Sequence, residues 1–130
     1  MNKPLYIVWR DACNIGVPVI DEQHRGIITT INSLYYFLEQ GYEVDFLKPT
    51  IDITRVYMGF HFATEKELLE KANYPGIEED RLARIKLFTQ FKQASTYKDP
   101  KLLLKFLLQW WINHINVEHK VYARFLTPHV

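Results

Sequence analysis

The sequence predicts an all-α fold, an up-down-up-down antiparallel four-helix bundle with a non-helical N-terminal arm. Apolar residues recur along the chain at the three- and four-residue spacing of a helix, not at the alternate spacing of a strand. Glycine, proline and asparagine turn signals divide this pattern into four stretches joined by short loops, which favours antiparallel neighbours. The length of 130 residues suits one domain, predicted to cover residues 1–130.

The arm is predicted at residues 1–18, which hold Trp9, Cys13, Gly16 and two prolines, and the bundle at residues 19–126. The first helix starts near Asp21, and Gly41 is well placed to stop it. Its apolar positions follow helical spacing: Ile27, Ile28, Ile31, Leu34, Tyr35 and Leu38.

The second helix is predicted to begin between Asp45 and Pro49, because proline is tolerated in a first helical turn. Its apolar residues are Ile53, Val56, Tyr57, Phe60, Leu68 and Leu69. The turn signal at residues 73–76 ends it and starts a third helix, with an inward stripe expected at Ile77, Leu82, Ile85, Phe88 and Phe91. Asp99 as N-cap and Pro100 at the first position open a fourth helix that runs towards Tyr122.

Composition excludes several classes of partner. Sixteen Lys and Arg against fifteen Asp and Glu give a formal net charge of +1, so we expect no nucleic-acid or membrane-surface partner. The most apolar stretch, 102–112, is far shorter than the roughly 20 residues of a membrane span. The single cysteine, Cys13, cannot form an internal disulfide and favours a reducing, cytoplasmic location. Composition does not indicate an oligomeric state.

Helical spacing could gather five metal-ligating side chains inside the bundle. They are His24, His61, Glu65, His114 and His119. His61 and Glu65 are four residues apart, so one helix face can present both to one ion. His114 follows two tryptophans in the least polar helix, where an imidazole needs a hydrogen bond or a metal. Each residue alone could instead be structural, but together they indicate a metal site.

The chain resembles the hemerythrins, specifically the single-domain bacterial ones, over nearly its whole length. The matching stretches are Trp9, Gly16-Val17-x-x-Ile20-Asp21-x-Gln23-His24, His61-Phe62-x-x-Glu65, Tyr74-Pro75 and Trp111-x-x-His114-Ile115. The resemblance implies an up-down four-helix bundle that holds two irons, bridged by an oxygen and two carboxylates, and binds dioxygen reversibly.

Three ligand positions of that family are substituted here. The resemblance assigns His24, His61, Glu65 and His114 to family ligands, with Glu65 as a bridging carboxylate. Where the family has a histidine pair after the Tyr-Pro turn, this chain has Asp80 and Arg84. Where the family has its bridging aspartate, five residues after the fourth-helix histidine, this chain has His119.

These substitutions fall on one of the two irons. By the resemblance, the first iron would take the two lost histidines and His114, and the second would take His24 and His61. Arg84 would repel a divalent cation, because a guanidinium is not deprotonated in proteins. We therefore expect one ion of non-heme iron rather than two. Zinc also accepts such ligands.

Several details of the site stay open at the level of sequence. His119 could add a third imidazole, and His114 could ligate or only hydrogen-bond a ligand. Asp80 could serve a second ion if Arg84 turned away, and Arg84 could instead pair with Glu65 or Asp80.

Three functions are consistent with this pattern. The leading one is a hemerythrin-like metal-binding protein with an altered, mononuclear site that binds or senses oxygen or another small ligand. The alternative is a degenerate, metal-free bundle that acts as an interaction module. The third is a non-heme iron redox enzyme acting on reduced oxygen species, although no independent catalytic base or nucleophile can be placed.

Overall fold

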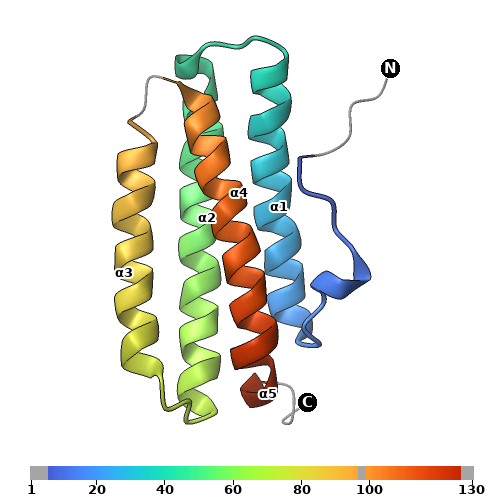
Figure 1. The fold of residues 1–130 in the computed structure, drawn as a ribbon, viewed down its shortest axis with the longest axis vertical. Helices are drawn as coiled ribbons and strands as arrows, with labels where there is room; N and C mark the ends of the chain where they lie inside the picture. The colour runs from blue at the N-terminus through green and yellow to red at the C-terminus, as the bar shows by residue number, and fades with distance from the viewer. Residues whose placement is uncertain (1–5, 97–98, 127–130) are drawn as a thin grey trace.

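The computed structural model describes residues 6–96 and 99–126, without the side chains of Val44, His119 and Lys120. Four long helices run side by side as an antiparallel bundle, which confirms the predicted all-α fold (Figure 1). They are α1 (Pro18–Glu39), α2 (Val44–Lys71), α3 (Ile77–Ala94) and α4 (Pro100–Val117). After α4 come η2 (Glu118–Tyr122), which is a π-helical turn, and the short α5 (Ala123–Leu126). None of the helices in these residues is long and apolar enough to cross a membrane.

Helices α1 and α2 form the most extensively packed pair of the bundle. Gly26 allows this, since a Cβ at that position would lie 2.2 Å from the ring of Tyr57. The apolar residues that predicted α2 are not all the buried ones. Ile53, Val56 and Phe60 are about half exposed. The buried side of α2 instead contains Leu47, Thr54, Met58, His61, Phe62, Glu65 and Leu69.

Helix α3 packs less closely, and its predicted inward stripe is wrong at two positions. Leu82 and Ile85 are 53% and 52% exposed, whereas Leu87, Phe91 and Ala94 are buried. The helix is therefore rotated so that some of its large apolar side chains face outward. Its inward face is left with smaller and more polar residues.

Helix α4 begins as predicted. The Asp99 side chain accepts a hydrogen bond from the backbone N–H of Lys101 at 3.0 Å, and Pro100 occupies the first position. The helical ladder then changes to a π-helical turn at η2, a feature that often marks functional sites.

The arm lies along α1, where its described part is held by side chains (Figure 1). The Asn32 amide accepts from the backbone N–H of Ile7 at 2.8 Å and donates to the Ile7 carbonyl at 2.9 Å. The Arg25 guanidinium stacks over Trp9, 4.3 Å from the ring centroid. These contacts fix the arm against the bundle.

Two apolar clusters fill the bundle and leave a polar layer between them. The smaller cluster contains Ile20 of α1 and Leu69 of α2, and the larger contains Ile27 of α1 and Phe62 of α2. His24 lies between the two isoleucines along α1. The same interruption occurs on α2 and at the end of α4, so the fold places its buried polar residues at one level.

Candidate metal centre

Four buried ligand-capable side chains meet in this polar layer. They are His24 of α1, His61 of α2, His114 of α4 and Glu118 of η2, and their ligand atoms all lie within 4.8 Å of one another. His24 and His61 lie well inside α1 and α2, while His114 and Glu118 lie at the junction of α4 and η2, where the helix continues without a break.

The distances from His114 to the other three ligand atoms suit a single ion. His61 Nε2 lies 3.0 Å from His114 Nε2, and His24 Nε2 lies 3.3 Å from His114 Nε2. Two imidazole nitrogens bound at about 2.1 Å to one metal are about 3.0–3.4 Å apart when the angle at the metal is about 90–109°. Glu118 Oε1 completes the set at 3.1 Å from His114 Nε2 and 3.6 Å from His61 Nε2.

Hydrogen bonds orient His61 for this role. The Thr64 hydroxyl donates to the Phe60 carbonyl at 3.3 Å and therefore accepts from Gln23 Nε2, at 2.8 Å. This turns Gln23 Oε1 towards His61 Nδ1, which donates to it at 3.0 Å. The proton of the imidazole is then on Nδ1, and the lone pair of Nε2 faces the cluster. Burial also lowers the pKa of His61, which keeps it neutral.

Two carboxyl groups share this buried space and titrate in opposite directions. Burial raises the pKa of Glu65 well above its usual range, and the negative charges of Glu118 and Asp80 add to that effect. Burial would also raise the pKa of Glu118, but His114 and His61 hold it well below its usual range. Without a cation, one carboxyl group is thus ionised while the other retains its proton.

The buried oxygens of these carboxyl groups test whether a metal would fit. Both oxygens of Glu118, and Oε2 of Glu65, lack a well-oriented hydrogen-bond donor within the described part of the chain, although His114 Nε2 approaches Glu118 Oε1 to 3.1 Å. Glu65 Oε2 lies 3.3 Å from His61 Nε2, at the edge of the cluster. Acceptor oxygens left without donors in a core are costly. Three imidazoles with such oxygens therefore fit a divalent cation.

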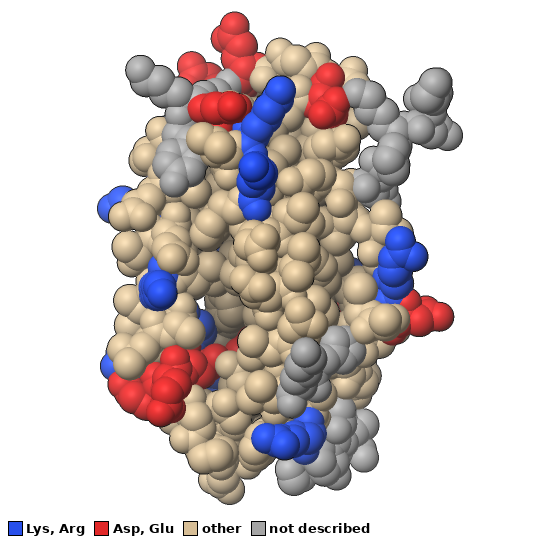
Figure 2. All heavy atoms as spheres, in the orientation of Figure 1, with Lys and Arg blue, Asp and Glu red and all other residues tan. Residues whose placement is uncertain are grey.

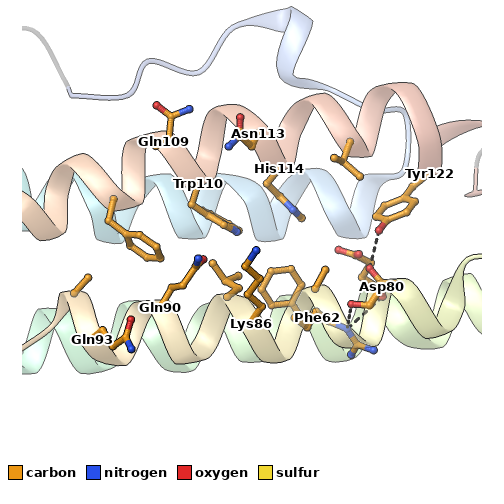
Figure 3. A pocket seen from close by; sticks show the side chains of 17 residues that line it. Phe62, Asp80, Lys86, Gln90, Gln93, Gln109, Trp110, Asn113, His114 and Tyr122 are labelled. Carbon is orange, nitrogen blue, oxygen red and sulfur yellow. Dashed lines mark hydrogen bonds and ion pairs between the residues drawn. The ribbon is translucent and has the colours of Figure 1, made fainter.

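The neighbouring part of the layer is closed by an ion pair within α3. Arg84 Nε lies 3.2 Å from Asp80 Oδ2, and the Tyr122 hydroxyl donates to Asp80 Oδ1 at 2.6 Å (Figure 3). Burial and this hydrogen bond raise the pKa of Tyr122, so it remains a neutral donor. Of the two partners considered for Arg84, the structure selects Asp80.

The residues predicted from sequence are brought together to different degrees. His24, His61 and His114 converge, and Glu65 lies beside them. His119 is in η2, but its side chain is outside the described part of the structure.

Sequence reasoning missed Glu118 because the family pattern directed attention to the fifth residue after His114. A signal was present nevertheless. His114 and Glu118 repeat the four-residue spacing of His61 and Glu65. Two helices that each present a histidine and a glutamate to the same interior form a matched ligand set.

Several known proteins are similar to the chain over most of its length. A bacteriohemerythrin of Stenotrophomonas maltophilia is 32% identical over 95% of this chain and 84% of its own length. A bacteriohemerythrin of Pseudomonas aeruginosa is 34% identical over 91% of this chain and 80% of its own length. A myohemerythrin of Riftia pachyptila is 25% identical over 86% of this chain and 87% of its own length. No protein-family model matches the chain. The helical bundle, its inward histidines and glutamates, and the identity to these relatives together show that the chain belongs to the hemerythrin family.

Proposed function

We propose that the protein is a mononuclear variant of its family, which holds one ion of non-heme iron and binds or senses dioxygen or another small ligand. The observation that carries the proposal is the convergence of four buried ligand atoms, from His24, His61, His114 and Glu118, within 4.8 Å. Polar atoms this close together in a core need a cation or shared protons between them, and among the described residues the Glu118 oxygens have no well-oriented hydrogen-bond donor.

The proposal of a single ion rests on the Asp80–Arg84 pair. The resemblance puts these residues where the family has two histidines, and here the guanidinium neutralises the carboxylate directly at 3.2 Å. A second cation beside Arg84 would meet a fixed positive charge. Tyr122 also occupies one oxygen of Asp80, so this carboxylate has few positions left for a metal.

Nitrogen and carboxylate ligation suits ferrous iron and can leave coordination positions open to a small ligand. The chain itself shapes the surroundings of those positions. Trp110 stacks on His114 with ring centroids 4.8 Å apart, and Trp111 contacts His24 edge to face at 5.2 Å. Phe62 packs against His61 and His114. These rings give the cluster apolar surroundings on one side, while Glu65 supplies a carboxyl group on another.

Metal analysis of protein purified without oxygen tests the proposal. We expect about one iron per chain, and loss of most of it in His61→Ala, because that variant removes the imidazole whose lone pair is fixed by Gln23. Phe60→Ala is the matched control, since Phe60 is on the same helix but half exposed. Zinc in place of iron would overturn the choice of metal. Much less than one metal per chain, unchanged by His61→Ala, would overturn the site.

A pair of neighbouring variants tests which residue completes the ligand set. Glu118→Ala is expected to weaken metal binding by at least about 100-fold, because it deletes a ligand and leaves only three imidazoles. His119→Ala is expected to leave the metal content unchanged, because three histidines and Glu118 already supply four ligands. Equilibrium competition with a chromophoric chelator measures both. A large loss of affinity in His119→Ala with none in Glu118→Ala would make His119 the fourth ligand instead.

A metal-free interaction module is the second candidate. The observation that favours it is the Asp80–Arg84 pair, because the resemblance puts both residues at family ligand positions and here they neutralise each other. Glu118 is not compensated in the same way, since no Lys or Arg is paired with it among the described residues. We therefore place this candidate second.

A further inference from the structure

A cavity of about 600 Å³ opens between α3 and α4 and reaches the metal centre at its inner end. Figure 2 shows the hollow between these helices, with acidic and basic side chains at its lower margin. Its walls are one face of each helix. The α3 wall includes Ala83, Lys86, Leu87 and Gln90, at helical spacing.

The cavity exists because α3 turns large apolar side chains away from it. Leu82 and Ile85 are half exposed on the outside of the bundle, while Ala83 and Gln90 face the gap. A groove of this kind left between two helices is stable only if it is wet or filled by a ligand.

Its size exceeds what a diatomic ligand needs. A molecule as small as water occupies about 30 Å³ in the liquid, whereas pockets for organic ligands measure about 300–1,000 Å³. The volume of about 600 Å³ belongs to the second class. The cavity therefore accommodates an organic molecule beside the centre, which the proposed function does not include.

The lining defines the chemistry of that molecule. The wall is apolar at Phe62, Leu87 and Trp110, which suits a hydrocarbon or aromatic body. Figure 3 shows Lys86 and Trp110 pointing from opposite helices into the space between them.

The charges on the cavity leave one cation available. Of the two basic residues in the lining, Arg84 is paired with Asp80. No ion pair is formed by Lys86 within residues 6–96 and 99–126. Its ammonium group is thus the unpaired charge of the cavity, and it attracts an anion.

We propose that this cavity binds a small organic carboxylate, with its carboxylate on Lys86 and its apolar body along Trp110 and Leu87 towards His114. The inference concerns a second ligand site, which shares only His114 with the four metal-ligating residues and is defined by Lys86, Leu87 and Trp110, none of which is a metal ligand.

Calorimetric titration of the full chain with octanoate tests this inference. We expect saturable one-to-one binding, with octanol weaker because it lacks the charge. Lys86→Met is expected to weaken octanoate binding about fivefold, as a partly exposed ion pair would. Lys92→Met, on the same helix but outside the lining, is the control and should bind normally.

A second variant fills the cavity directly. Ala83→Leu adds a branched side chain in the lining and is expected to abolish octanoate binding, whereas Ala63→Leu, an exposed site on α2, should not. No saturable binding, or equal affinity in Ala83→Leu and Ala63→Leu, would overturn the site. Equal binding of octanol, unaffected by Lys86→Met, would overturn its preference for an anion. Metal content measured on the same samples separates this outcome from that of the metal proposal.

Discussion

Replacing Asp80 and Arg84 together by histidine is expected to raise the metal content from about one to about two ions per chain. The two positions are four residues apart on α3, so their imidazoles would share one face. The change deletes the guanidinium that repels a cation and the carboxylate that it neutralises. Glu65 and Glu118 would then lie between two ions and could bridge them. Metal analysis of anaerobically purified protein measures the change.

A matched control separates ligand supply from charge removal. Asp80→Asn with Arg84→Gln also abolishes the ion pair but adds no imidazole, and it should keep about one ion per chain. If the double-histidine variant also stays at about one ion while remaining folded, Arg84 is not what limits the centre to a single metal. Circular dichroism establishes that both variants keep the bundle.

Removing the metal from the wild-type protein is expected to lower its melting temperature by roughly 10–20 °C, as for a ligand present at about 1,000 times its dissociation constant. The physical reason is the cost of burying these metal ligands without an ion. Without an ion, Glu118 is a buried carboxylate whose oxygens lack a well-oriented hydrogen-bond donor among the described residues, and it lies close to a second carboxyl group, Glu65. Thermal melts before and after chelation, followed by addition of iron, measure the effect.

The variant His61→Ala serves as the reference for this experiment, because it should melt at the same temperature with and without chelator. A wild-type protein whose melting temperature does not respond to chelation would favour the metal-free interaction module. A response in wild type that persists in His61→Ala would place the stabilising ion elsewhere.

Much of the fold could be predicted from the sequence because helix spacing and turn chemistry are local signals. The start of α4 is an example, since Asp99 and Pro100 act through bonds within one turn. The inward face of α3 could not be predicted in the same way. Leu82 and Ile85 look like core residues, but burial is decided by how the helix rotates against α2 and α4, which periodicity does not specify.

In the candidate centre, too, some residues could be predicted from local sequence signals and others could not. The three converging histidines could be found from spacing and resemblance, because each sits on a regular helix. Glu118 was missed although its four-residue spacing from His114 is a local signal, because the family pattern points to the fifth residue after His114. Gln23 illustrates another limit. Its role depends on a chain of hydrogen bonds through Thr64, and the two residues are 41 positions apart.

The bond between Tyr122 and Asp80 has a consequence for how the bundle is held together. In a centre where α3 supplies metal ligands, loss of the metal would also release that helix from its neighbours. Here a tyrosine of η2 joins α3 at 2.6 Å without any ion, and Arg84 holds the acceptor in place. The attachment of α3 is therefore independent of the supply of metal. Loss of the ion would therefore loosen the packing between α1, α2 and α4 and leave the contact of α3 with η2 in place.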